Sequence, residues 1–128
     1  MSRDAKRAKK RAALKKGQFG EWLALAALLA KGWRILARNY AAHGGEIDII
    51  AKRGSVIAFV EVKARADFTQ AEAAIDGFKL TRMARAASHW LARNPWALAH
   101  TVRIDAIDIV PRRWPRHRTD IAPLDAGH

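Results

Sequence analysis

Two Ile- and Val-rich segments separated by three residues constrain the fold of this chain more than any other feature. They cover residues 46–52 and 56–65, and Arg53-Gly54-Ser55 lies between them. Short β-branched segments on either side of a break that contains glycine are typical of a β-hairpin. The pattern therefore predicts two antiparallel strands joined by a tight turn.

Helix and strand patterns flank this hairpin on both sides. Apolar residues recur at helical spacing over residues 18–31, and Gly32 follows where a helix commonly ends. Thr69 and Glu72 match a capping box, which opens a longer helix that bends near Gly77. The other expected elements are a strand over 33–40, a loop over 41–45, the long helix continuing to residue 93, and a strand over 101–110.

This order of elements predicts an α/β sandwich in which helices flank a mixed central β-sheet. The long helix lies between the third and fourth strands in the chain. We expect it to form a right-handed crossover between two parallel strands.

The chain has a large excess of positive charge, which makes an anionic partner the leading expectation. Its 128 residues contain 24 Lys and Arg against 12 Asp and Glu, a formal net charge of +12. Nucleic acid is the first candidate and an acidic membrane surface the second. Much of the excess lies in residues 1–16, which we interpret as a flexible basic arm before a single domain over residues 17–128. The alternative is a solvated tail that only aids solubility.

A second basic cluster, over residues 112–118, contains four arginines and Trp114. Prolines at positions 111 and 115 break regular structure, so we expect a loop here. Trp114 could stack on a nucleic-acid base or pack on the domain, and the sequence leaves both open.

Composition excludes several other classes of protein. The chain has no cysteine, which excludes a disulfide framework, a Cys-based zinc site and a thiol nucleophile. Its longest apolar run, residues 22–30, is far shorter than the ~20 residues that cross a bilayer. No signal-peptide pattern is visible. We therefore expect a cytoplasmic protein without a membrane partner.

Two carboxylates, Asp48 and Glu61, stand inside the apolar strands of the hairpin. A buried carboxylate is costly unless a cation compensates it, and carboxylate oxygens are the ligands that Mg²⁺ prefers. Lys63 lies two residues after Glu61 and therefore on the same face of the strand. Lys63 either orients a water molecule beside a metal ion or forms a structural ion pair with Glu61. The Glu-x-Lys spacing alone favours the structural ion pair.

The parity of the hairpin decides whether these side chains meet. A two-residue turn at residues 53–54 would place Asp48 diagonal to Glu61, on the same face as Glu61 and Lys63. A three-residue loop would turn Asp48 to the other face. Glu21, in the first helical turn, is a further candidate carboxylate, although a residue in that position more commonly faces solvent.

Five ordered motifs lie within residues 15–110. They are Gly17-Gln-Phe-Gly-Glu21-Trp-Leu-Ala, Ile35-Leu-Ala-Arg-Asn39-Tyr, Gly45-Glu-Ile-Asp-Ile-Ile-Ala51, Phe59-Val-Glu-Val-Lys-Ala-Arg65 and Val102-Arg-Ile-Asp-Ala-Ile-Asp-Ile109. Together they resemble the YraN-type family, small bacterial proteins of the restriction-endonuclease-like, or PD-(D/E)xK, superfamily. That superfamily includes the related archaeal Holliday junction resolvases.

The resemblance implies a restriction-endonuclease-like sandwich and a metal-dependent endonuclease that hydrolyses phosphodiester bonds. It makes Asp48, Glu61 and Lys63 the catalytic residues. Glu21 joins Asp48 and Glu61 as a candidate ligand of Mg²⁺ or Mn²⁺. The basic residues expected to contact nucleic acid are Lys9, Lys10, Arg11, Lys15, Lys16, Arg65 and Lys79.

DNA, including branched DNA, is the expected substrate. Because the related resolvases act as dimers, the resemblance also suggests a homodimer. The alternative function comes from a different class. It is a non-catalytic nucleic-acid-binding protein that retains the nuclease fold.

Overall fold

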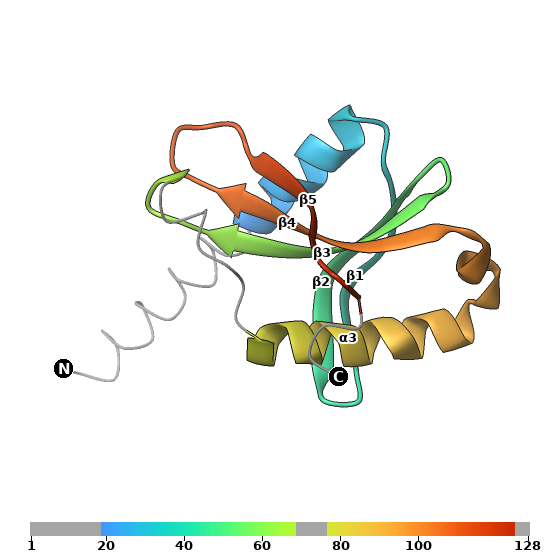
Figure 1. The fold of residues 1–128 in the computed structure, drawn as a ribbon. Helices are drawn as coiled ribbons and strands as arrows, with labels where there is room; N and C mark the ends of the chain where they lie inside the picture. The colour runs from blue at the N-terminus through green and yellow to red at the C-terminus, as the bar shows by residue number, and fades with distance from the viewer. Residues whose placement is uncertain (1–18, 69–76, 125–128) are drawn as a thin grey trace, which may run out of the picture.

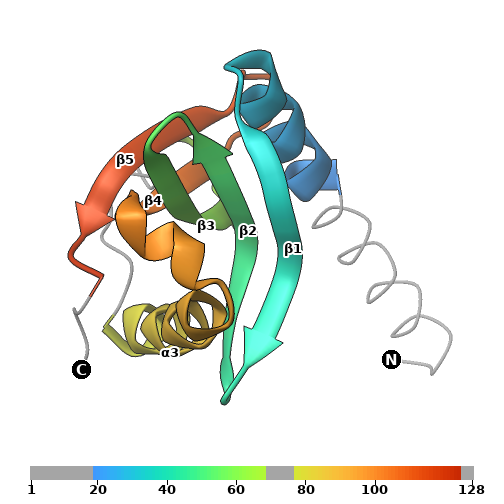
Figure 2. The same cartoon turned by 90° about the vertical axis from the view of Figure 1, so that its right-hand side faces the viewer.

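The computed structural model describes residues 19–68 and 77–124, in which a five-stranded β-sheet lies between two α-helices (Figures 1 and 2). In spatial order the strands are β1 (Arg34–Ala42), β2 (Gly45–Arg53), β3 (Val56–Ala64), β4 (Thr101–Ile109) and β5 (Arg116–Ala122). Neighbouring strands are antiparallel except β3 and β4, which are parallel. The helices are a first helix over residues 19–30, α3 (Gly77–Arg93) and the 3₁₀ helix η1 (Pro95–Ala99). The expected α/β fold with a mixed sheet is confirmed.

The sheet separates two hydrophobic clusters, one under each helix. Ile50 and Phe59 pack with α3, whereas Ile49 and Leu28 belong to the cluster under the first helix. Successive residues of a strand point to opposite faces, so the near-continuous apolar runs of β2 and β3 supply both clusters. Each large side chain buried in this way contributes about 1.5–3 kcal/mol.

The turn between β2 and β3 consists of Gly54 and Ser55, with Arg53 paired to Val56. The turn expected at residues 53–54 is therefore wrong by one position. Gly54 has a φ of 59°, a left-handed conformation that glycine adopts without cost at the first position of such a turn. An arginine in that position would be strained. The opposed residues shift by two, so the parity of the hairpin is preserved.

The loop expected over residues 41–45 is reduced to the two-residue turn of His43 and Gly44. Both have positive φ, 53° and 74°, as a tight hairpin turn requires. Gly45 follows and packs against α3, where an added Cβ would lie 1.9 Å from the carbonyl oxygen of Arg82. Only glycine allows this approach, and the Nε of Arg82 donates to the carbonyl of Gly44 at 3.1 Å. The tip of the hairpin is thereby fixed on α3.

The loop expected over residues 112–118 is wrong in its second half, because β5 begins at Arg116. The sequence of β5 has no apolar alternation that would have revealed a strand. Its place depends on pairing with β4 and on tertiary ion pairs. His117 contacts Asp105, and Arg118 contacts Asp108, both on β4.

Some expectations fall outside the described residues. These are the basic arm of residues 1–16 and the capping box at Thr69 and Glu72. Within the described ranges, no helix is long and apolar enough to cross a membrane.

Candidate active site

Asp48 lies in β2 where the hydrogen-bonded ladder between β2 and β3 ends. The last paired positions are Ile49 and Val60, and one step further along the strands Asp48 comes level with Glu61. The main-chain N–H of Val62 donates to Oδ2 of Asp48 at 2.8 Å. This bond fixes the carboxylate of Asp48 against β3.

Glu61, on β3, is almost fully buried, with 1% of its surface exposed. Its Oε1 contacts the ammonium group of Lys79 and lies 3.6 Å from that of Lys63. Its Oε2 is buried and receives no hydrogen bond from an N–H or hydroxyl group of the described residues, and the carboxylate of Asp48 lies within hydrogen-bond reach of the Glu61 side chain. A buried carboxylate oxygen without a donor is an atom that a bound cation would satisfy.

The charges of these groups depend on one another. Burial, and then the negative charge of Asp48, raise the pKa of Glu61 to about 7. Burial and the nearby ammonium group of Lys79 lower the pKa of Lys63. Burial alone would lower the pKa of Lys79, but its contacts with Glu61 and Lys63, together with the negative charge of Asp48, outweigh burial and raise it. Groups with shifted pKa values are concentrated at functional sites, although structural ion pairs also produce them.

Glu21 is held by β1 and does not join this acidic pair. Its Oε1 accepts hydrogen bonds from Arg38 at 3.3 Å and from Asn39 at 3.1 Å. Asn39 occupies the β1 position opposite Asp48 in the strand register. In residues 19–68 and 77–124, no group of three or more His, Asp or Glu side chains is arranged to hold a metal ion. The structure thus brings together Asp48 and Glu61, and it leaves Glu21 on the first helix, bonded to β1.

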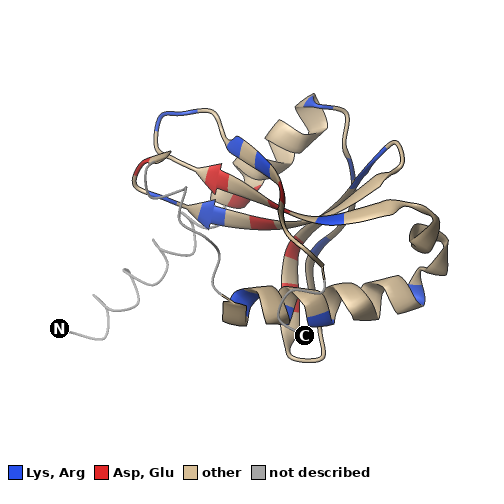
Figure 3. Cartoon of the chain, in the orientation of Figure 1, with Lys and Arg blue, Asp and Glu red and all other residues tan. Residues whose placement is uncertain are grey.

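Two of the basic residues expected to contact nucleic acid lie in the described part of the chain, and the other five do not: Lys9, Lys10, Arg11, Lys15 and Lys16. Lys79 contacts Glu61 and so belongs to the acidic site. Arg65 follows β3, and its main-chain N–H donates to Ile109 at 2.8 Å. Its Nε is buried without a hydrogen-bond partner among the described residues. Figure 3 shows Lys and Arg gathered at this end of β3, on the turn between β4 and β5, and at the start of α3.

Asp108 and Arg118 extend the row of charges across the sheet, and the sequence reasoning missed them. Lys63 and Asp108 are paired positions of β3 and β4. Arg118 donates to Asp108 from Nε at 2.6 Å and from Nη2 at 3.1 Å. This bidentate pair neutralises Asp108 and leaves Lys63 beside Glu61. Asp108 stands inside an apolar strand sequence, which is the signal that singles out Asp48, so the same argument could have found it. In the structure Asp108 is fully buried.

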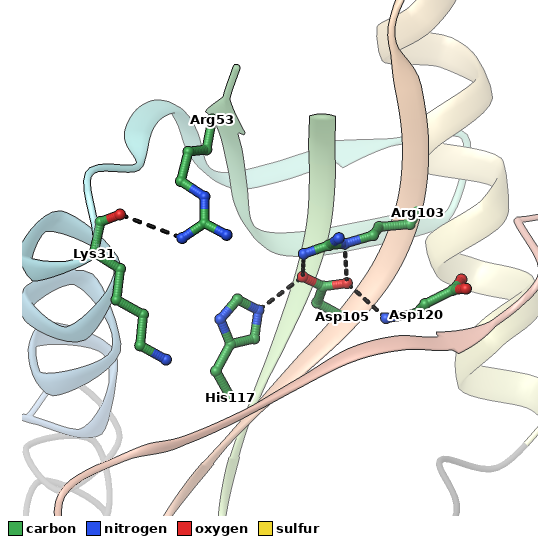
Figure 4. A network of polar contacts seen from close by, with 6 residues as sticks. All are labelled: Lys31, Arg53, Arg103, Asp105, His117 and Asp120. Atoms are coloured by element: carbon green, nitrogen blue, oxygen red, sulfur yellow. Dashed lines mark hydrogen bonds and ion pairs between the residues drawn. The ribbon is translucent and has the colours of Figure 1, made fainter. Parts of the chain in front are cut away.

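A second polar network surrounds Asp105, which is fully buried (Figure 4). Asp105 accepts two hydrogen bonds from Arg103, at 3.0 and 3.2 Å, and one from the N–H of Asp120 at 2.9 Å. The Nε2 of His117 lies 2.7 Å from its carboxylate. Burial alone would raise the pKa of Asp105, but these partners together lower it. The network joins β5 to β4.

The fold and the site define an α/β protein whose mixed sheet brings an acidic pair and two lysines together on β2, β3 and α3. The chain belongs to the family described as uncharacterised protein family UPF0102, whose model matches residues 20–109. The matched range includes the acidic pair and both lysines but ends before β5. The expected membership of the YraN-type family is confirmed at this level.

Proteins of several bacteria resemble this chain over nearly its whole length. A UPF0102 protein of Methylobacterium nodulans is 54% identical over 117 residues, 91% of each chain. One of Methylorubrum extorquens is 56% identical over 110 residues, 86% of each chain. One of Brucella canis is 45% identical over 122 residues, 95% of each chain.

Proposed function

We propose that this protein is a metal-dependent endonuclease of the restriction-endonuclease-like type that hydrolyses phosphodiester bonds of nucleic acid, with DNA as the first substrate to test. The observation that carries the proposal is the grouping of Asp48 and Lys63 around the buried carboxylate of Glu61 at the end of the β2–β3 ladder. Two adjacent carboxylates with one unsatisfied buried oxygen fit the donor set of Mg²⁺ or Mn²⁺.

Each residue of the site has a defined role in this proposal. Asp48 and Glu61 would hold the ion, and the carbonyl of Val62, which lies between Glu61 and Lys63, would be a third protein ligand. When bound, the ion supplies Lewis-acid polarisation of the phosphate and eases ionisation of a water molecule. Lys63 orients the attacking water and offsets negative charge in the transition state. Overall, water adds across a P–O bond, and the leaving oxygen takes up a proton.

Glu21 has a supporting role in the proposal. Its carboxylate is hydrogen-bonded to Arg38 and Asn39, so it would reach the ion only if those hydrogen bonds broke. We therefore assign it the positioning of Asn39 beside Asp48. A homodimer and a cytoplasmic location remain predictions from the sequence.

The test is cleavage of labelled branched, duplex and single-stranded DNA, and of single-stranded RNA, with Mg²⁺, with Mn²⁺ and with a chelator. Asp48→Asn is the inactive comparison. Cleavage that requires the metal and Asp48 supports the proposal. Equal cleavage by wild type and Asp48→Asn identifies a contaminating nuclease and removes the support.

One observation favours a second candidate, a nucleic-acid-binding protein without catalysis. Lys79 already contacts Oε1 of Glu61, so a lysine supplies the positive charge that a metal ion would bring. Titration with Mn²⁺ separates the two functions. A nuclease must bind Mn²⁺, and Asp48→Asn must weaken that binding. A protein that only binds nucleic acid needs no Mn²⁺.

A further inference from the structure

The turn between β4 and β5 projects a tryptophan into solvent at the end of the sheet where the acidic site lies. Trp114 is 60% exposed. Within the described residues, no aromatic ring or cation packs on its indole. Most of the indole is therefore available to stack on a base.

The turn holds Trp114 in a defined place. Arg112 has a φ of 62°, and the N–H of Arg113 donates to the carbonyl of Val110 at 3.2 Å. Pro115, the next residue after Trp114, is buried and has a restricted backbone. A side chain on such a turn loses little further conformational freedom on binding, which favours its use as a contact.

Strand register connects this turn to the acidic site. Arg116 pairs with Asp108, and Asp108 pairs with Lys63. The three positions form one row across β5, β4 and β3, so Arg116 lies two strand spacings, about 10 Å, from Lys63. Trp114 is two residues further along the turn. The turn that carries Trp114 therefore lies at the same end of the sheet as the acidic site.

The surroundings of Trp114 are cationic. Arg112, Arg113 and Arg116 are exposed, and no acidic residue occurs between Asp108 and Asp120. Arg65, which follows β3 and donates its main-chain N–H to Ile109 at the end of β4, has a buried Nε with no hydrogen-bond partner among the described residues. Positive groups that follow a phosphate backbone, together with an exposed aromatic ring, are the elements of single-strand recognition.

An indole stacks on a base only if the face of that base is accessible. Bases in a continuous duplex are stacked on one another, whereas those of a single strand, flap or branch point present a free face. We propose that Trp114 is a base-stacking residue that makes the protein prefer nucleic acid with unpaired nucleotides beside the Asp48–Glu61 site. This inference rests on the proposed function for the identity of that site, and Trp114 lies outside the range matched by the family.

The experiment measures binding without cleavage. Fluorescence anisotropy in the presence of a chelator follows the full-length protein on a labelled DNA single strand of about 16 nucleotides, on the duplex of the same sequence, and on the RNA single strand. Trp114→Ala should weaken binding to either single strand by about 5-fold to 100-fold, the range for one lost stacking contact. The duplex affinity should change by less than about 2-fold. Trp114→Phe should retain most of the single-strand affinity.

The matched control is Trp96→Ala, which removes a 47% exposed tryptophan from η1, at the opposite end of β4. It should change neither affinity. Equal losses on single strand and duplex, or no loss on either, would overturn the proposal. A selective loss in a protein that cleaves nothing would retain the role of Trp114 and count against the proposed nuclease. If the protein cleaves nucleic acid and Trp114→Ala has no effect on binding, the nuclease is supported and the role of Trp114 is overturned.

Discussion

The side chain of Asp48 accepts the main-chain N–H of Val62 at the position where β2 and β3 stop pairing. This bond does two things. It satisfies a donor of β3 that the ladder leaves open, and it holds a carboxylate close enough to Glu61 to raise the pKa of Glu61. The acidic pair is therefore a consequence of how the hairpin ends.

Asp48→Asn tests this relationship, because an amide oxygen still accepts the N–H of Val62 while the negative charge is lost. The pKa of Glu61 should fall from about 7 toward its ordinary value. Mn²⁺ affinity should fall by at least the roughly 10–100-fold that loss of an outer-shell partner costs. Carbon NMR of Glu61 and calorimetric titration measure the two effects. Glu46→Gln, an exposed position of β2, should change neither.

Lys63→Ala separates chemistry from binding. The cleavage rate should fall by about 10²-fold or more, as for other groups that position a proton transfer. Nucleic-acid affinity should change little, because one charge among 24 basic residues is lost. Single-turnover kinetics and equilibrium binding provide the comparison, with Lys52→Ala on β2 as the control. Full activity in Lys63→Ala would reduce Lys63 to an ion-pair partner of Glu61.

The raised pKa of Glu61 makes stability depend on pH. The folded state binds the proton of the Glu61 carboxyl more tightly than the unfolded state does. The stabilisation that this protonation gives the folded state is complete below pH 4.5 and is lost as pH rises through about 7. The neutral variant Glu61→Gln should gain up to about 3 kcal/mol relative to wild type between pH 4.5 and pH 8. Urea unfolding at the two pH values measures the gain. A constant difference would mean that Glu61 titrates normally.

The sequence predicted those parts of the fold that depend on local pattern. Ile and Val runs around Gly54 indicated the hairpin, and its parity correctly placed Asp48 and Glu61 on one side. The register was wrong by two residues because glycine takes the first turn position, where the expected turn put Arg53.

Tertiary contacts determined what the sequence could not predict. β5 has no apolar alternation, and its position depends on Asp105 and Asp108 in β4. Lys79 was expected to contact nucleic acid, and in the structure α3 places it against Glu61. The spacing of residues along the chain gives no sign of this contact. The bond from Asn39 to Glu21 likewise requires the first helix to pack beside β1.

Asp105 should be a major source of stability for β5. Asp105→Asn leaves Arg103 and His117 without their buried anion and should cost about 3 kcal/mol at pH 7. The lowered pKa of Asp105 means that its contribution is present above the unfolded pKa and is lost as pH falls through the folded one. The difference between wild type and variant should therefore shrink in acid. Asp120→Asn is the control, because Asp120 contributes its main-chain N–H and its side chain is exposed.

The basic arm should strengthen nucleic-acid binding without setting its specificity. Residues 2–16 contain eight Lys and Arg against one Asp. Each phosphate neutralised on duplex DNA contributes roughly 0.9 to the slope of log affinity against log salt. Deleting residues 2–16 should therefore flatten that slope by several units, and by about the same amount for duplexes of different sequence. In the shortened protein Trp114→Ala should still weaken binding to single strands selectively. An unchanged slope would identify the arm as a solubility tail, and a change confined to one sequence would show that it reads bases.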